Sequence, residues 1–347
     1  MKRKVTLQDI ARKLNLSATT ISLALRDHPR ISIETKERVC QTLKKMNYEP
    51  DQVARALVTG RSNLIGVIVP NSNDPYYAEV FRGIEDAARG ANYHVLLSSG
   101  SYDLDGYADH VKDMIGLRVG GLIAAPPFMS EKPILSPFWH NLEKFNFHVV
   151  LVNRQLNPPI FHQVAADYIS GVRMAVESLA SLRHRRVAYI SGEPVLLPIR
   201  QRLMAFRRFA KMHGFESDPA LFERSPLTAA GGYDACRRLW ANIRKKPSAI
   251  VAFSDTVAVG VLRFLHEQNL QIPRDISVIG FDGIPLGDFT YVSLSTISTP
   301  MYEIGKQAFE LLLNSIHNNP GLPQSMILPV KFVLRESVGP ALSRKKS

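Results

Sequence analysis

The stretch TLQDIARKLNLSATTISLAL, residues 6–25, reads as two short helices joined by a tight turn at residues 15–17. Thr6 is a candidate N-cap, and Asp9 three residues later completes a pattern similar to a capping box. Ser17 is a candidate N-cap for the second helix. Apolar residues recur at helical spacing in the first helix, at Leu7, Ile10, Ala11 and Leu14. The stretch therefore predicts a helical hairpin with capped ends and an apolar seam.

The two faces of the second helix differ in character. The face that can pack on the first helix carries Ile21, Ala24 and Leu25. The opposite face presents Ala18, Thr19, Ser22 and Leu23. A capped second helix with an outward face fits the major groove of DNA, where it reads base edges. A hairpin that serves only as scaffold is the alternative interpretation.

Positive charge is concentrated at the amino-terminal end. Residues 1–60 hold 12 Lys and Arg against 6 Asp and Glu, a net charge of +6 and half of the chain's net +12. Such a concentration of positive charge in one small segment favours a polyanionic partner such as double-stranded DNA. An ordinary solvated surface is the alternative explanation of the same charges.

A third helix and a short linker follow the hairpin. Ser32 is the candidate N-cap of a helix that runs to about Met46, with Val39 and Leu43 on its inner face. Residues 51–58 are partly apolar but too few to form a stable isolated helix. The sequence therefore predicts three helices around one very small core, followed by a linker.

From Leu64 onward, short apolar runs alternate with helical stretches. This alternation is typical of parallel sheets covered by helices on both faces. Its length exceeds one hydrophobic core and predicts two lobes facing a cleft, with ligands at the carboxyl ends of the strands. The predicted strands are residues 64–69, 94–98, 121–125, 149–152, 186–191, 249–254 and 276–281.

No sequence pattern nominates a catalytic, metal or cofactor site. The two cysteines, Cys40 and Cys236, have no Cys or His beside them at metal-ligand spacing, and the 10 histidines are scattered. The sequence shows neither a phosphate-binding glycine loop nor a nucleophile elbow. We therefore expect no enzyme activity, no bound metal and no cofactor.

Hydropathy gives no sign of a membrane segment. No run approaches 18 apolar residues, and the basic start MKRK leads into the mixed residues 5–14 instead of an apolar signal core. We expect a cytoplasmic protein with no membrane partner.

Sequence motifs in a fixed order run along nearly the whole chain. The amino-terminal ones are residues 5–9, 17–25 and 47–50. The later ones are LIGVIVP at 64–70, RLMAF at 202–206, FSD at 253–255, ISVIGFD at 276–282 and LSTI at 294–297. Together they resemble the lactose-repressor/galactose-repressor family of bacterial transcription regulators. The agreement of hairpin, linker and two-lobed core makes this resemblance far more specific than any single motif.

The resemblance implies a homodimer that binds a near-palindromic operator and is controlled by a small-molecule effector. The core is expected to resemble periplasmic sugar-binding proteins, so a sugar or sugar derivative is the implied effector. Members of the family are either released from DNA or made to bind it by their effector. The implied domains are a helix-turn-helix headpiece at 1–49, a hinge helix and linker at 50–60, a two-lobed effector-binding and dimerisation core at 61–340 and a basic tail at 341–347.

Larger family members form tetramers through an additional carboxyl-terminal leucine-heptad helix. Here the last apolar strand pattern, residues 326–334, is followed only by residues 335–347. The sequence therefore favours a dimer.

The resemblance assigns DNA contacts to individual residues. Ala18, Thr19 and Leu23 match the base-reading positions of the second helix. Leu23 stands where Arg is frequent, so it cannot pair with guanine and would touch a thymine methyl group or pack inward. Positions that contact the DNA backbone are matched by Thr6, Ser17, Thr20, Ser22, Arg30 and Ser32. Capping is the alternative role for Thr6, Ser17 and Ser32.

The family's hinge matches residues 50–60. It becomes helical on the operator, pairs with its dimer mate and inserts a leucine into the minor groove. Leu57 aligns with this wedge, and Val53 and Ala54, near it in the sequence, are the other DNA contacts implied for the hinge. A linker that Leu57 merely anchors is the alternative. The low stability of the isolated segment is what would allow an effector to control its folding.

Effector contacts are expected at strand ends of the core. Arg202 aligns with an arginine that often hydrogen-bonds sugar hydroxyls, and such a fork beside carboxylates suits a polyhydroxylated ligand. The candidate effector-binding residues are Asn73, Tyr76, Tyr77, Phe128, Arg154, Arg202, Ser254, Asp255 and Asp282. Ser254 and Tyr168 stand where Asn is common, so an unusual ligand is expected. Strand-end Asp residues also cap helices, which is the alternative role for Asp255 and Asp282.

Two other classes of protein share parts of this pattern. A solute-binding receptor of a transport system has a two-lobed core, but it predicts a secretory signal and no headpiece. An enzyme working in the cleft needs a nucleophile with a base, or a metal cluster, and the motifs show neither. The transcription regulator is therefore the leading hypothesis.

Overall fold

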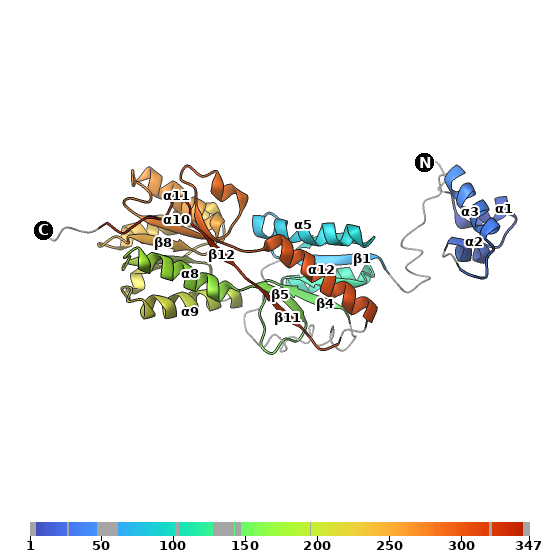
Figure 1. Cartoon of the computed structure of the whole chain (residues 1–347), viewed down its shortest axis with the longest axis horizontal. Helices are drawn as coiled ribbons and strands as arrows, with labels where there is room; N and C mark the ends of the chain where they lie inside the picture. The colour runs from blue at the N-terminus through green and yellow to red at the C-terminus, as the bar shows by residue number, and fades with distance from the viewer. Residues whose placement is uncertain are drawn as a thin grey trace. The chain divides into compact units, whose positions relative to one another are not determined.

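The computed structural model describes residues 5–25, 28–46, 62–100, 104–127, 142, 147–194, 196–318 and 321–342, with the side chains of Leu7, Leu25, Leu104 and Asp105 excepted. The chain forms two compact units, Met1–Ser62, the headpiece, and Asn63–Ser347, the core. Figure 1 shows the elements of both units. Four of the predicted contact residues, Val53, Ala54, Leu57 and Phe128, lie outside the described residues.

In its described residues, the headpiece has three helices: α1 (Leu7–Leu14), α2 (Ala18–Leu25) and α3 (Ile33–Lys45). The Thr6 hydroxyl accepts a hydrogen bond from the Asp9 amide, and the Asp9 side chain accepts one from the Thr6 amide, which completes the predicted capping box. Asn15 ends α1 in the left-handed conformation with φ of 51°. The Ser17 hydroxyl caps α2 by accepting a hydrogen bond from the Thr20 amide at 3.0 Å. These local bonds fix the predicted turn.

The headpiece core is small and apolar. Ile10, Ile21 and Val39 are fully buried, one from each helix, and Ala11 and Ala24 pack beside them. Partly buried residues close the cluster: Val5, Leu14, Leu16, Ile31, Leu43 and Met46. The predicted inner faces of the second and third helices are therefore confirmed at Ile21, Ala24 and Val39.

One lobe of the core, lobe 1, is a six-stranded sheet in the order β11-β5-β4-β3-β1-β2, with every pair parallel. Its strands are β1 (Leu64–Val69), β2 (His94–Ser99), β3 (Gly121–Ala124), β4 (Val149–Val152), β5 (His162–Ala166) and β11 (Ser325–Leu328). Its helices are α5 (Pro75–Gly90), α6 (Leu104–Gly116) and α12 (Met301–Asn318). Because side chains alternate along a strand, Val67 packs with α5 and α12 while Ile68 packs with α6 on the other face.

Helices α5 and α12 cross at two glycines, Gly83 and Gly305. A Cβ at Gly83 would lie 2.0 Å from the carbonyl oxygen of Tyr302, and one at Gly305 would lie 1.9 Å from that of Val80. Only glycine allows the two backbones to approach this closely. The pair runs side by side along one face of the lobe 1 sheet (Figure 1).

The other lobe, lobe 2, is a six-stranded sheet in the order β12-β10-β9-β8-β6-β7. Its strands are β6 (Val187–Ser191), β7 (Phe222–Arg224), β8 (Ala249–Ala252), β9 (Ser277–Asp282), β10 (Ser295–Ser298) and β12 (Lys331–Val333). Helices α8 (Tyr168–Ser181) and α9 (Leu197–Met212) cover one face, and α10 (Ala229–Asn242) and α11 (Asp255–Glu267) cover the other. Short 3-10 turns, η2 (Pro219–Leu221) and η3 (Pro285–Asp288), complete it. The β10–β12 pair is antiparallel and the remaining pairs are parallel.

Within the described residues, the chain passes between the lobes at three places. It leaves β5 for α8 at Asp167, returns from β10 to α12 at residues 299–300, and crosses from β11 to β12 at residues 329–330. Figure 1 shows α8 with lobe 2 and α12 with lobe 1. The expected single strand at residues 326–334 is therefore wrong: its two halves belong to different sheets.

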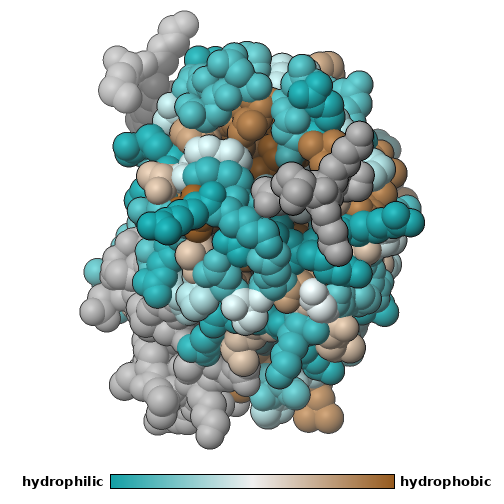
Figure 2. All heavy atoms as spheres, turned by 90° about the vertical axis from the view of Figure 1, so that its left-hand side faces the viewer, coloured by the Kyte–Doolittle hydropathy of each residue, from teal (hydrophilic) through white to brown (hydrophobic). Residues whose placement is uncertain are grey.

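Figure 2 shows the hydropathy of one face of the core surface. Viewed from the end that carries lobe 2, it is largely hydrophilic, with apolar side chains in scattered patches (Figure 2). Among the residues that the structure describes, no helix is long and apolar enough to cross a membrane. The predicted fold class, a small helical headpiece followed by a two-lobed α/β core, is confirmed, and the predicted hinge helix lies outside the described residues.

Candidate functional site

The outward face of α2 is the first candidate site. Ala18 and Thr19 are exposed, and Ser22 and Leu23 are half-buried. Leu23 is not among the residues of the described apolar cluster of the headpiece. The structure thus leaves Ala18, Thr19 and Leu23 on one accessible face.

Three of the six predicted backbone-contacting residues cap helices. The hydroxyls of Thr6, Ser17 and Ser32 each accept a hydrogen bond from the amide three residues later. Ser17 is also 2.8 Å from the hydroxyl of Thr20. These residues therefore stand at helix starts, where free amides and a hydroxyl together favour a phosphate group. Arg30 is exposed in the turn that precedes α3.

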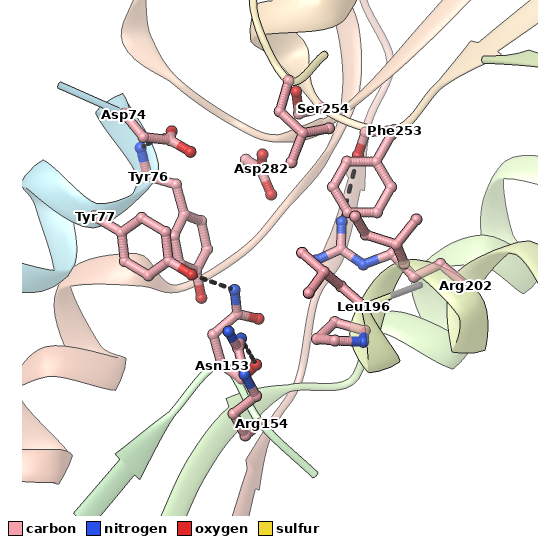
Figure 3. A pocket seen from close by; sticks show the side chains of 13 residues that line it. Asp74, Tyr76, Tyr77, Asn153, Arg154, Leu196, Arg202, Phe253, Ser254 and Asp282 are labelled. Carbon is pink, nitrogen blue, oxygen red and sulfur yellow. Dashed lines mark hydrogen bonds between the residues drawn. The ribbon is translucent and has the colours of Figure 1, made fainter. Parts of the chain in front are cut away.

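The second candidate site is a cavity between the two lobes. It encloses about 580 Å³ of empty space, including its open mouth. Side chains from the start of α5 lie on one side and those of α9 on the other, with Asp282 between them (Figure 3). The lining residues are Asp74, Tyr76, Tyr77, Asn153, Arg154, Leu196, Pro198, Ile199, Arg202, Leu227, Phe253, Ser254 and Asp282. Most follow the carboxyl ends of strands, as expected for parallel sheets.

Arg202 is one of two buried arginines that line this cavity. It is only 3% exposed, and its guanidinium carbon lies 3.7 Å from the ring centre of Tyr168 and 4.4 Å from that of Phe253. Its Nη1 donates to the Phe253 carbonyl oxygen at 3.3 Å, whereas the buried Nε has no hydrogen-bond partner in the described protein. A buried charge with an unused donor is costly unless a ligand supplies an acceptor.

Two carboxylates face the same cavity from opposite lobes. Asp74 caps α5 by accepting a hydrogen bond from the Tyr76 amide at 3.0 Å, and Asp282 ends β9. Burial raises the pKa of both carboxyl groups, while the charge of Arg202 opposes this rise. The Tyr76 amide hydrogen bond also favours the charged form of Asp74, whereas no described residue donates a hydrogen bond to the carboxylate of Asp282.

Two tyrosines connect the lobes beside the cavity. The Tyr76 hydroxyl of α5 lies 2.7 Å from the Tyr168 hydroxyl at the start of α8. Burial raises the pKa of both phenols, so both remain neutral hydroxyls at physiological pH. Asn153 donates weakly to the Tyr77 hydroxyl at 3.4 Å, and its buried Oδ1 has no partner within the described residues.

Arg154 lines the cavity but is held by the backbone. Its guanidinium donates to the carbonyl oxygens of Pro126, of Asn153 at 2.7 Å and of Ala125 at 3.2 Å. It therefore fixes the ends of β3 and β4, and Arg202 offers the freer donor.

The structure brings six of the predicted effector residues to one cavity: Tyr76, Tyr77, Arg154, Arg202, Ser254 and Asp282. It does not bring Asn73 or Asp255 there. Asn73 is exposed in the turn before α5, one residue away from the cavity-lining Asp74. Asp255 is fully buried beneath the cavity, where its carboxylate binds backbone amides, so the expected direct contact with a ligand is corrected.

Sequence reasoning missed several lining residues, notably Asp74, Asn153 and Phe253. Asn153 directly follows β4 and Phe253 follows β8, so the strand-end criterion that selected Arg154 and Ser254 applies equally to them. Asp74 precedes Pro75, a pattern typical of the start of a helix, but the candidate effector-binding residues include its neighbour Asn73 instead. The remaining lining residues are apolar, so nothing in the sequence marked them as ligand contacts: Leu196, Pro198, Ile199 and Leu227.

Comparison with known proteins follows the same division of the chain. Residues 6–51 match the family described as bacterial regulatory proteins, lacI family, and residues 176–338 match the periplasmic binding protein-like domain. The ribose operon repressor of Halalkalibacterium halodurans is 29% identical over 332 residues, which cover 96% of each chain.

Solved structures show the same fold. A lac repressor dimer bound to operator and to the anti-inducer ONPF superposes with a TM-score of 0.87 at 23% identity, covering 97% of this chain and all of the other. A LacI-family transcriptional regulator from Enterococcus faecium with bound ribose gives a TM-score of 0.70 at 25% identity, covering 80% of this chain and 99% of the other. The two family matches occur in one chain, and the ribose operon repressor and the lac repressor structure match it along nearly its full length. The chain therefore combines a lacI-family helix-turn-helix domain with a periplasmic binding protein-like domain.

Proposed function

We propose that the chain is a DNA-binding transcription regulator that acts as a repressor. It binds a near-palindromic operator as a homodimer, and a small-molecule effector controls this binding. One observation carries this proposal: a headpiece with an exposed, capped second helix is joined to a core with a polar cavity between its lobes. A transport receptor accounts for the cavity alone. We place the regulator in the cytoplasm and assign it no catalytic activity.

On the DNA side, we assign base reading to Ala18, Thr19 and Leu23. The hydroxyl and methyl groups of Thr19 suit either base type, and Leu23 suits a thymine methyl group. The helix starts capped by Thr6, Ser17 and Ser32 would bind phosphates together with Thr20, Ser22 and Arg30.

On the effector side, we propose a sugar or a sugar derivative. The cavity presents a guanidinium donor at Arg202, carboxylate acceptors at Asp74 and Asp282, and the rings of Tyr77 and Phe253. Alternating donors and acceptors beside aromatic rings match the hydroxyls and the apolar faces of a polyhydroxylated ring.

The DNA-binding half of the proposal is tested with fragments selected from genomic DNA by the full chain. Affinity for a selected fragment is expected to fall by about 1,000-fold or more between ~50 and ~200 mM salt, the loss typical of about six or more phosphate contacts. Fluorescence anisotropy measures this dependence. An affinity that does not change with salt would contradict binding through the basic headpiece.

The effector half is tested by thermal shift of the full chain with D-ribose, other pentoses, hexoses and nucleosides. A ligand at about 100 times its Kd is expected to stabilise the core by about 2.7 kcal/mol. A panel in which no polyhydroxylated compound stabilises the protein would contradict the proposed effector class.

Replacing Asp74 by Asn is expected to lower effector affinity by about tenfold, because a charged acceptor becomes a neutral one. The Asn side chain still accepts a hydrogen bond from the Tyr76 amide, so the start of α5 is preserved. Isothermal titration of the stabilising sugar measures the change. Asn73→Ala is the matched control, since Asn73 lies outside the cavity and its loss is expected to leave the affinity unchanged. Equal affinities of D74N and the unmodified chain would remove Asp74 from the site.

Effector binding is expected to strengthen as the pH rises. Burial raises the pKa of Asp74 and Asp282 in the empty cavity. Ligand hydroxyls that donate to these carboxylates favour the charged forms and lower both pKa values, so binding releases protons. Titration calorimetry from about pH 5 to about pH 8 measures this, with a gain of up to about tenfold per pH unit for each proton released. A flat or opposite dependence would contradict charged acceptors.

A further inference from the structure

The backbone at the end of β9 takes an unusual course. Asp282 has φ of +104° and Gly283 has φ of +79°. A side chain other than glycine rarely adopts such a φ, so this turn persists only where its surroundings impose it. The turn matters because it directs the carboxylate of Asp282 into the cavity, where no described residue donates a hydrogen bond to it.

The carboxylate of Asp255 lies directly behind this turn. Its Oδ2 accepts hydrogen bonds from the amides of Gly283 at 2.7 Å and Ile284 at 2.9 Å. Its Oδ1 accepts one from the Thr296 hydroxyl at 2.7 Å. The two amides are those that immediately follow Asp282, so one side chain of α11 binds both of them, while Thr299 binds the Asp282 carbonyl oxygen.

The surroundings of Asp255 are shaped around its carboxylate. Asp255 is 0% exposed, and a Cβ at Gly280 of β9 would lie 2.1 Å from its Oδ1. Burial raises the pKa of Asp255 to about 7, and its three hydrogen bonds together with the more distant charge of Arg335 oppose this rise. Glycine at position 280 therefore leaves the space that the buried carboxylate of Asp255 occupies next to the turn.

We infer that Asp255 is a positioning residue for the effector: it holds the turn at residues 282–284, and that turn aims Asp282 at the ligand. The inference rests on the proposed function, because it acts through the effector cavity. It replaces the direct ligand contact expected for Asp255 with an indirect one, made by Asp282 alone.

A double-mutant cycle separates positioning from general support of the fold. Titration calorimetry of D-ribose with the full chain at about pH 8 gives the Kd of D255A, D282A and the double variant. Both single variants are expected to weaken binding by about tenfold, and the double variant is expected to bind no more weakly than D282A, since Asp255 then has no Asp282 to position. A further tenfold loss in the double variant, or a D255A variant that binds like the unmodified chain, overturns the inference.

Conservative variants keep the test decisive if D255A folds poorly. D255N retains an oxygen that accepts both amide hydrogen bonds, so its affinity is expected to stay within about threefold of the unmodified chain. Asp275→Ala is the matched control: Asp275 also accepts an amide hydrogen bond in lobe 2, from Gln271 at 2.9 Å, but lies outside the cavity. A D275A variant that loses as much affinity as D255A contradicts a specific role for Asp255.

Amide hydrogen exchange tests the turn without any ligand. Exchange at Gly283 and Ile284 is expected to be about tenfold faster in D255A than in the unmodified chain and close to unchanged in D255N, with β6 as the internal reference. Protected amides in D255A overturn the inference even where D-ribose fails to bind. Failure of ribose binding with faster exchange in D255A counts against the proposed effector and supports the role of Asp255 in the turn.

Discussion

Replacing Arg202 by Ala is expected to abolish the response to the effector while operator binding is retained. The guanidinium is buried between aromatic rings and keeps an unused donor at Nε, so it offers the charged hydrogen bonds that a sugar hydroxyl or ring oxygen needs. Charged hydrogen bonds contribute about 1.5–3 kcal/mol each, so two of them amount to a loss of at least about 100-fold in affinity. Titration calorimetry measures effector affinity, and anisotropy measures operator affinity with and without the effector.

Arg207→Ala is the matched control for this experiment. Arg207 lies on the same helix, α9, but is exposed, with its guanidinium 4.8 Å from the ring centre of Phe222 and away from the cavity. R207A is expected to bind effector and operator like the unmodified chain. If R202A still responds to the effector, the pocket lies elsewhere; if R207A loses the response as well, a general effect of α9 explains both.

Replacing Leu57 by Ala is expected to weaken operator binding by about 10- to 100-fold and to leave effector affinity unchanged. This prediction rests on the sequence resemblance, because Leu57 lies outside the described residues. A leucine inserted between base steps in the minor groove kinks the DNA duplex. The unstacking costs a few kcal/mol, which wider contact between protein and DNA offsets. Alanine is too short to hold the kink open. Anisotropy on a selected fragment and calorimetry with the stabilising sugar measure the two affinities.

Leu322→Ala serves as the control for loss of a leucine side chain. Leu322 is 87% exposed in the loop before β11, and its truncation is expected to change neither affinity. Equal operator affinities for L57A and the unmodified chain would remove the minor-groove wedge and leave Leu57 as a linker anchor.

The headpiece could be predicted because its determinants are local. Helical spacing placed Ile10, Ile21 and Val39 inside, and short-range caps at Thr6 and Ser17 marked the helix starts. Each of these signals acts within a few residues of chain, and periodicity records such signals directly.

The core was less fully predicted where long-range contacts decide the structure. Strand β5 contains the polar residues His162 and Gln163, so the sequence did not indicate that the strand is buried. Gln163 can be buried because its side-chain amide accepts a hydrogen bond from the Leu156 amide and donates one to the Leu156 carbonyl oxygen, both at 3.0 Å. The apolar run at residues 326–334 reads as one strand, but it divides between two sheets because the chain changes lobe at residues 329–330. No local pattern records which sheet a strand joins.

The cavity residues also divide into those that local sequence patterns predict and those that depend on long-range contacts. The family resemblance found Arg202 and the strand-end criterion found Asp282, and the fold brings the two together from α9 and β9. The strand-end criterion also selected Asp255, whose carboxylate turns toward residues 283–284 because the strained turn there leaves two amides without strand partners. The direction of a side chain at a strand end depends on such partners from elsewhere in the chain, and sequence spacing does not contain them.

Footprinting on fragments that the full chain selects from genomic DNA tests the central claim most directly. The account predicts protection of a site with two-fold symmetry, whose two halves are protected together as protein concentration rises. Adding the stabilising sugar is expected to change the occupancy of this site by the unmodified chain but not by R202A. Protection of no symmetric site at any salt concentration, or an occupancy indifferent to every ligand that stabilises the core, would contradict it.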